Sequence, residues 1–366
     1  MRYLILLILV FFSTFSYAHK SSDSYLSLNV DGPEISLRWD IAIRDLQNVM
    51  DLDVDQDRNV QWREIKRNQA EIIAYSLARL KLSSNELACY FEPAGLKINE
   101  RSDGFYVVIY ASGKCVENIE ALEIQYDMFF DVDTQHRGLL KLASGDKNIS
   151  YAFSPKVSSK IFELKNNYTT DTFIHFFIEG VWHIWIGFDH ILFLLSLLLP
   201  AVLLRYRKQW VGVEDFPKAL IEVVKIVTAF TVAHSLTLSL VMLANISLPV
   251  MLVESIIAFS VFVAAMNNLY PVISQKRWIV GFLFGLIHGF GFANVLSELE
   301  LNSSALFTTL LGFNVGVELG QLAIVAVFMP IAYLLRNGWL YQKIIFKLGS
   351  VSIASIGLIW LFQRAL

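Results

Sequence analysis

The chain has 366 residues, of which 55% are hydrophobic and 17% charged, and its mean hydropathy is +0.50. This composition is too apolar for an ordinary soluble enzyme and indicates a membrane protein. The net charge of -3 is small, and no basic patch interleaved with aromatic residues occurs, so we expect no nucleic-acid partner. After residue 172 the apolar residues recur in blocks of roughly 20, the length that crosses a bilayer, whereas the preceding part has the pattern of a globular domain.

The first 18 residues, MRYLILLILVFFSTFSYA, combine one arginine, a short apolar run and small residues at Ser16 and Ala18. This pattern is typical of a secretory signal peptide, and we predict cleavage after Ala18. The alternative is an uncleaved anchor helix. Cleavage leaves residues 19–170 as a domain in the bacterial periplasm, followed by a membrane domain at residues 171–366.

Residues 19–170 are predicted to form a β-rich domain. In EISLRWDIAI, apolar and polar residues alternate strictly, which indicates a half-buried strand. Its inward side chains are Ile35, Leu37, Trp39, Ile41 and Ile43. SYLSLNV before it, and GFYVVIYA and ALEIQYDMFFDV after it, show similar patterns, and the turn DGP predicts a hairpin. We expect a small antiparallel β-sandwich with one helical insertion.

The helical insertion begins with DVDQDRNVQWRE, which has the spacing of an EF-hand calcium loop at residues 53–64. Oxygen-bearing side chains occupy the six liganding positions of such a loop: Asp53, Asp55, Asp57, Asn59, Gln61 and Glu64. Arg58 stands where the motif normally has glycine, and a helix is predicted from about Trp62 to Leu80. The alternative is an acidic loop that binds no calcium and only caps this helix. If calcium binds, we expect its role to be structural.

The sequence contains 2 cysteines, Cys89 and Cys115, and both lie in the predicted exported domain. An oxidising compartment favours pairing of such cysteines. A metal–thiolate site is disfavoured because the CxxC spacing is missing. We therefore predict the disulfide Cys89–Cys115, which stabilises the domain by about 3 kcal/mol through the loop that it closes.

The membrane domain is predicted to contain six transmembrane helices. Their approximate ranges are 180–203, 219–243, 249–271, 278–297, 305–334 and 345–363. Basic residues concentrate in cytoplasmic loops, and the loops after the first, third and fifth spans hold Arg205, Arg207, Lys208, Lys218, Lys276, Arg277, Arg336, Lys343 and Lys347. The intervening loops ANISLP and SELELNSS carry none. We predict a multi-pass inner-membrane protein whose N-terminal domain is periplasmic.

Titratable residues lie within these apolar spans, where an ionisable side chain is costly and usually faces the bundle interior. By the helical rise per residue, His190, His234 and His288 all lie about 13–15 Å below the outer boundary. Glu318 lies about 20 Å down on the same count. We expect one shared cavity that opens to the periplasm. The predicted metal-contacting set is His183, Asp189, His190, His234, His288 and Glu318.

Two of these histidines, His183 and His190, are seven residues apart and are expected to share one helix face. Asp189 is expected to orient an imidazole on a neighbouring helix, as carboxylates do for metal-bound histidines. Neutral imidazoles with one or two carboxylates suit Ni²⁺, Zn²⁺, Co²⁺ or Cu²⁺. Four polar residues are expected to support the site: Ser235, Glu254, Asn314 and Gln321. Taken singly, each is equally explained as an interhelical hydrogen-bond partner or a boundary residue.

Four segments carry a resemblance to a known family: HIWIGFDH, which fits an H-x5-DH signature, and AHSLT, GLIHGFGFA and GFNVGVELGQ. Over nearly the whole chain the sequence resembles HupE/UreJ-type proteins, which are associated with hydrogenase and urease maturation. The resemblance implies a nickel permease-like membrane protein with His183, Asp189 and His190 as metal-contacting positions. The sequence departs from the family's second motif, FHGxAHGxE, because FGLIHGFGF keeps only His288, and Glu318 is the candidate to replace its glutamate.

Three functions fit these features. The leading hypothesis is a transition-metal permease for nickel or zinc, in which imidazoles replace the ion's hydration shell. The second is a periplasm-facing, zinc-dependent intramembrane hydrolase with three histidine ligands and Glu318 or Asp189 as general base. The third is a non-catalytic assembly or sensor protein whose exported domain binds a periplasmic protein.

Overall fold

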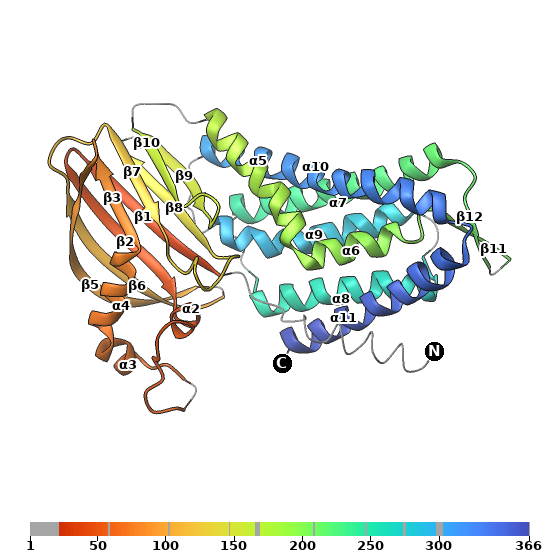
Figure 1. The fold of residues 1–366 in the computed structure, drawn as a ribbon, viewed down its shortest axis with the longest axis horizontal. Helices are drawn as coiled ribbons and strands as arrows, with labels where there is room; N and C mark the ends of the chain where they lie inside the picture. The colour runs from red at the N-terminus through yellow and green to blue at the C-terminus, as the bar shows by residue number, and fades with distance from the viewer. Residues whose placement is uncertain are drawn as a thin grey trace. The chain divides into compact units, whose positions relative to one another are not determined.

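The computed structural model describes residues 22–57, 59–101, 103–145, 147–164, 169–207, 209–244, 246, 248–273, 276–297 and 303–365. The chain forms two compact units, shown in Figure 1. One contains His19–Thr172 with Val295–Thr308 and is rich in strands, and the other contains Phe173–Asn294 with Thr309–Leu366 and is helical. The predicted signal peptide and its cleavage site lie outside the described residues.

The strand-rich unit is a sandwich of two sheets that share one hydrophobic core. The six-stranded sheet has the order β5-β6-β2-β1-β8-β9, and the four-stranded sheet has the order β10-β7-β3-β4. The strands of the first are β1 (Asp23–Asp31), β2 (Glu34–Ala42), β5 (Tyr90–Arg101), β6 (Gly104–Lys114), β8 (Arg137–Ser144) and β9 (Lys147–Phe153). Those of the second are β3 (Leu80–Ser84), β4 (Leu87–Ala88), β7 (Ala121–Tyr126) and β10 (Ser159–Glu163). The predicted β-rich N-terminal domain is confirmed.

Strands β1 and β2 form the predicted hairpin, and Gly32 adopts the positive φ of +60° that its tight turn requires. The alternating residues of β2 are buried as predicted: Ile35, Leu37, Trp39 and Ile41. Ile43 is also buried, but it begins the short helix α2 (Ile43–Gln47) and does not continue the strand. The expectation of a purely antiparallel sandwich is wrong, because β1 pairs with β8 in parallel. A long connection separates these two strands, as parallel pairing requires.

The helical insertion contains two helices, α3 (Trp62–Arg67) and α4 (Gln69–Ala78). The predicted single helix from Trp62 to Leu80 is therefore wrong. Asn68 ends the first helix and begins the second with φ −91° and ψ 7°, outside the helical region.

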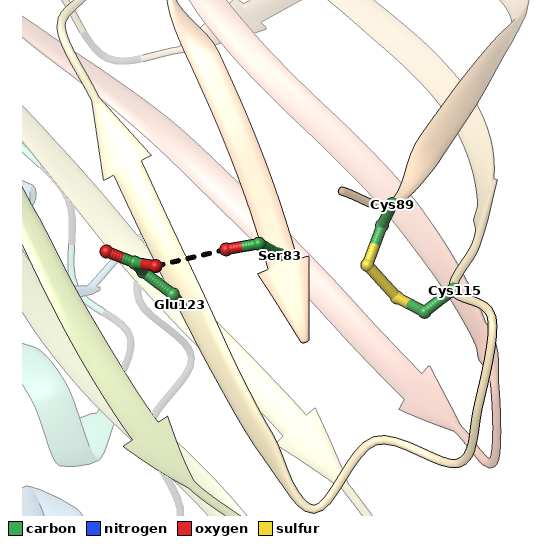
Figure 2. The surroundings of a disulfide bond; sticks show 4 residues. All are labelled: Ser83, Cys89, Cys115 and Glu123. Carbon is green, nitrogen blue, oxygen red and sulfur yellow. Dashed lines mark hydrogen bonds between the residues drawn. A yellow bond between two sulfur atoms is a disulfide. The ribbon is translucent and has the colours of Figure 1, made fainter. Parts of the chain in front are cut away.

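The disulfide between Cys89 and Cys115 is present (Figure 2). Cys89 directly follows β4 in one sheet, and Cys115 directly follows β6 in the other. Both cysteines are buried. Figure 2 also shows Ser83 of β3 donating a hydrogen bond to Glu123 of β7 at 3.1 Å. The disulfide between Cys89 and Cys115 therefore links the ends of the two sheets covalently.

The helical unit is a bundle of apolar helices (Figure 1). Its helices are α5 (Thr169–Ile186), α6 (Phe188–Leu198), α7 (Phe216–Ala244), α8 (Val250–Leu269), α9 (Arg277–Ser297), α10 (Ser303–Leu335), the π-helical η1 (Leu340–Leu348) and α11 (Gly349–Ala365). Within the described residues, 4 helices are long and apolar enough to cross a membrane, and the bent pair α5–α6 makes up to 5. The helical membrane bundle is thus confirmed, whereas the count of six spans stays a prediction.

The first span differs from its predicted range of 180–203. Helix α5 begins at Thr169, and α6 follows at Phe188 after a bend of 70°. A hairpin of β11 (Leu203–Tyr206) and β12 (Gln209–Gly212), which the sequence pattern did not predict, then precedes α7. The break between α5 and α6 lies at Gly187, whose backbone is extended with φ −69° and ψ 93°.

Glycines set how closely the helices approach one another. A Cβ atom on Gly289 of α9 would lie 2.8 Å from the carbonyl oxygen of His234 on α7. A Cβ atom on Gly312 of α10 would lie 2.6 Å from the carbonyl oxygen of Phe173 on α5. Small residues permit such backbone contact in membranes. The close seam between α7 and α9 places their histidine-bearing faces against each other.

A chain of buried hydrogen bonds runs through the strand-rich unit. His136 contacts Ser22 Oγ through Nδ1 at 2.6 Å and Tyr126 Oη through Nε2 at 2.8 Å, and Ser22 donates to Asp45 at 2.9 Å. Burial raises the pKa of Asp45 to about 6, although Arg44 and the Ser22 hydroxyl act in the opposite direction. Burial also lowers the pKa of His136 to about 3. The folded network therefore holds a proton on the carboxyl and a neutral imidazole between pH 4 and 6.

The Asp45→Asn variant should make the protein more sensitive to acid. Between about pH 4 and 6, folding adds a proton to Asp45 and removes one from His136, so their effects on stability cancel in the wild type. Without the Asp45 carboxyl, only the contribution of His136 to the pH dependence of stability remains. Stability should then fall by about 1.4 kcal/mol per pH unit as the pH decreases through this range. Urea unfolding of the full-length variant at several pH values measures the slope, and a slope equal to that of the wild type would contradict the assignment.

Candidate metal centre

His183 and His190 meet because the first span is broken between them. His183 lies in the last turn of α5 and accepts the N–H of Gly187 at 3.1 Å through its carbonyl. Helix α6 then starts in a new direction, and the two imidazole centroids lie 4.6 Å apart. The expectation that both residues lie on one face of a continuous helix is wrong. The bend at Gly187, rather than the seven-residue spacing, brings the rings together.

Two further histidines complete a cluster, His234 from α7 and His288 from α9. The His234 ring lies 6.2 Å from that of His183 and 6.5 Å from that of His190. The His288 ring lies 4.9 Å from that of His190. One nitrogen each from His183, His190 and His234 lie within 4.8 Å of one another. Nitrogens bound to one zinc-sized ion are at most about 4.2 Å apart, so a small adjustment suffices to coordinate a cation.

Nitrogens of these rings are buried without any hydrogen-bond partner in the described part of the chain. They are His183 Nε2, His190 Nε2, His234 Nδ1 and Nε2, and His288 Nδ1. Buried polar atoms in folded proteins are nearly always bonded, because an unpaired one is costly in an apolar medium. Several of these nitrogens therefore lie at one place where a single cation could contact them. A neutral imidazole nitrogen offers a lone pair, which is what a transition-metal cation requires.

Asp189 orients His190. Its Oδ1 accepts the His190 backbone N–H at 2.8 Å and lies 2.9 Å from His190 Nδ1. A carboxylate accepts only, so Nδ1 carries the proton and Nε2 keeps the free lone pair. The expectation that Asp189 orients a ring on a neighbouring helix is thus wrong, because it acts on the next residue. Its other oxygen faces Arg364 Nη1 at 3.9 Å, at the end of α11.

Ser260 of α8 fixes the tautomer of His288. The Ser260 hydroxyl donates to the carbonyl of Ile257 at 2.6 Å, and its oxygen lies 3.0 Å from His288 Nε2. Since the hydroxyl proton is already used, Nε2–H must donate to Ser260. The lone pair of His288 is therefore on Nδ1, the atom without a partner.

The predicted ligand Glu318 is not part of the three-histidine group. Thr228 donates a hydrogen bond to its Oε1 at 2.7 Å, and its Oε2 is buried without a partner. Gln321 accepts a hydrogen bond from Thr231 at 3.2 Å. Among the described residues, the group of side chains whose ligand atoms lie within 4.8 Å of one another consists of three histidines and includes neither Glu318 nor Asp189. Metal contact by these two carboxylates stays a prediction.

The other predicted supporting residues have local roles in the structure. Ser235 donates to the carbonyl of Thr231 at 2.7 Å, within α7. Asn314 donates to the carbonyl of Leu310 at 2.8 Å and lies beside His234, while its Oδ1 has no partner among the described residues. The backbone carbonyl of Glu254 accepts from Arg364 at 3.3 Å. Of these, Asn314 is the one whose side chain interacts with a histidine of the cluster.

Aromatic rings enclose the histidines. Phe292 and Phe313 stack with centroids 4.2 Å apart, and the His183 ring lies 4.9 Å and 5.2 Å from them. Phe230 lies 5.2 Å from His288, and Phe193 also lies 5.2 Å from that ring. Such apolar surroundings exclude competing water and strengthen electrostatic attraction to a cation.

The EF-hand-like loop brings three of its carboxylates together. Oxygens of Asp53, Asp55 and Asp57 lie within 4.8 Å of one another. Glu64 accepts the backbone N–H groups of Gln61 at 2.9 Å and Val54 at 2.8 Å, bonds that lower its pKa. Arg63 pairs with Asp55 at 3.1 Å. Asn59 and Gln61 bond to Asp57, and Arg58 lies outside the described residues. Calcium binding stays a prediction.

Several residues of the site were not found by sequence reasoning. The sequence does contain a signal for Arg364, because a cationic side chain in the last turn of an apolar helix is unusual and needs a partner. Ser260 has none, since serines in such helices commonly bond only to their own backbone. Gly187 lies inside the quoted HIWIGFDH segment, but a single glycine does not by itself reveal a break.

The chain was compared with known proteins and protein families. The family model described as HupE / UreJ protein matches residues 159–364, more than half of the chain and all of the histidine cluster. A search of curated proteins found no match.

Substituting Gly187→Ala should disrupt the centre. The new Cβ would lie 2.7 Å from the His183 carbonyl oxygen and 2.9 Å from His190 Nδ1, so the bend must open. Affinity for Ni²⁺, measured by isothermal titration on purified protein, should fall by about tenfold or more, as for loss of a group that orients a ligand. Gly349→Ala is the matched control, because its Cβ meets only Leu199 at 3.7 Å. Unchanged affinity in Gly187→Ala would contradict this role.

Proposed function

Because the chain belongs to the HupE / UreJ protein family, we propose that this multi-pass membrane protein is a permease for a divalent transition-metal cation of the nickel type. The proposal places it in the bacterial inner membrane with the strand-rich unit in the periplasm. The distribution of basic residues among the loops supports that orientation. The ion is the cargo of the protein, with Ni²⁺ or Zn²⁺ as candidates.

One observation carries the proposal: in an apolar bundle, imidazole nitrogens from α5, α6 and α7 lie within 4.8 Å of one another, and the His288 ring of α9 lies 4.9 Å from that of His190. His183, His190 and His234 are the proposed ligands, and His288 is positioned to join or exchange with them. Asp189 and Ser260 hold His190 and His288 in the tautomers that present a lone pair. Replacing the hydration shell of the cation by these nitrogens would let it enter the bilayer.

Transport is favoured over metal-dependent hydrolysis by the placement of the carboxylates. A hydrolase needs a general base beside the metal-bound water. Asp189 already accepts two hydrogen bonds from His190, and Glu318 bonds to Thr228 outside the three-histidine group. Among the described residues, neither carboxylate belongs to the three-histidine group that would hold the metal-bound water.

We also propose that residues 53–64 bind calcium with a structural role. The convergence of Asp53, Asp55 and Asp57 within 4.8 Å supports this proposal, since a shared cation would offset the repulsion among the three carboxylates. Calcium binds six to eight oxygens, which carboxylates and carbonyls of one loop supply.

The His190→Ala variant should lose metal. Elemental analysis of the purified wild type after incubation with Ni²⁺ should find about one ion per chain, the stoichiometry of a single site. His190→Ala should retain little, and uptake of Ni²⁺ by cells should fall to background. His175→Ala is the control, because it removes an imidazole from the preceding helix α5, outside the three-histidine group. Equal metal content in both variants would refute the assignment.

Calcium should stabilise the strand-rich unit. At a concentration 100 times the dissociation constant, the stabilisation should be about 2.7 kcal/mol. Thermal unfolding of the full-length protein with Ca²⁺ and with chelator measures it. The gain should disappear in Asp55→Asn and persist in Asp131→Asn, whose exposed carboxylate lies outside the loop and pairs with Arg79 at 3.6 Å. No shift in the wild type would argue for a capping loop instead.

A further inference from the structure

Glu318 of α10 is a carboxylate that the histidine centre does not use. Its Oε1 accepts one hydrogen bond, from the Thr228 hydroxyl at 2.7 Å, and its Oε2 is buried with no partner in the described residues. An unpaired carboxylate oxygen inside an apolar bundle is costly. This oxygen is therefore in a position to receive a cation.

Glu318 belongs to a series of polar contacts along the seam between α7 and α10. Asn314 lies beside His234 of the histidine centre. Thr231 donates to Gln321 at 3.2 Å, and Thr228 donates to Glu318 at 2.7 Å. Glu318 and Gln321 are three residues apart, which makes them neighbours on the helix surface. The seam thus continues from the histidines as a row of oxygen atoms.

This row of oxygen atoms extends from the histidines toward the predicted cytoplasmic side of the membrane. Thr231 precedes His234 by three residues and Thr228 by six, so they lie about 4.5 Å and about 9 Å further along α7 by its helical rise. The start of α7, with Lys218, is the end that the basic loops assign to the cytoplasm. Thr228 is exposed beside an open groove of about 610 Å³, which is also lined by Val224 and Lys225 of α7 and by Trp278 of α9. The Lys225 ammonium is paired with Glu222 at 2.7 Å.

We infer that Glu318, Gln321, Thr228 and Thr231 form a second cation site, which receives the divalent metal from the histidines on its way inward. The inference rests on the proposed permease function. Oxygen ligands bind Ni²⁺, Co²⁺ and Zn²⁺ more weakly than imidazole does. A weak site after a strong one lets the ion leave, since conduction requires binding that is favourable but not too tight.

The test separates metal binding from transport in the Glu318→Gln variant. Binding of Co²⁺ to the purified full-length protein is followed by its visible absorption spectrum, which reports the histidine ligands. Uptake of Ni²⁺ is measured in proteoliposomes. The variant should keep the wild-type spectrum and affinity while uptake falls by about tenfold or more, the effect of losing an interaction made only in transit. Glu214→Gln, an exposed residue before α7, is the control with unchanged uptake.

The outcomes are distinguishable. Normal uptake by Glu318→Gln overturns the second site and leaves the permease proposal intact. Loss of Co²⁺ binding together with uptake places Glu318 in the histidine centre and also overturns a separate site. Absence of Co²⁺ binding by the wild type removes the permease proposal itself. Thr228→Val provides an independent variant in case Glu318→Gln does not fold, and it should likewise reduce uptake without changing the Co²⁺ spectrum.

Discussion

The bend at Gly187 is the constraint on which the histidine centre depends. A continuous helix would keep His183 and His190 two turns apart, about 10 Å along its axis. The 70° change of direction instead brings their rings to 4.6 Å. It also places Asp189 in the first turn of α6, where its carboxylate accepts the His190 backbone N–H. Negative charge is favourable at that end of a helix, so the break stabilises the residues that it collects.

The surrounding helices then determine which atoms the rings present. Ser260 and Asp189 each occupy one nitrogen of their histidine and leave the other bare. The phenylalanines exclude other partners, while glycine seams hold α7 against α9. An apolar bundle would normally avoid such polar atoms, since each lost hydrogen bond is costly. The arrangement is understandable when a cation completes it, which joins the geometry to the family's association with metal handling.

The strand-rich unit solves a different problem. It has its own hydrophobic core, a disulfide that links the two sheets and a buried proton-holding network around His136. These features stabilise the strand-rich unit, and none of them uses the histidines of the helical unit. The chain thus combines two stabilising strategies: burial of apolar surface from water in one unit, and small-residue packing within lipid in the other.

The sequence by itself determined the β-rich domain, the apolar helical bundle, the family and the candidate histidines, because alternation, span length and intramembrane polarity are local properties of the chain. It did not predict the parallel pairing of β1 with β8, the break at Asn68 or the role of Asp189. Only the tertiary structure decided that His183, His190 and His234 converge while Glu318 bonds to Thr228 instead. Convergence depends on the direction in which each helix leaves its neighbours, and that direction follows from packing among distant segments rather than from any one of them.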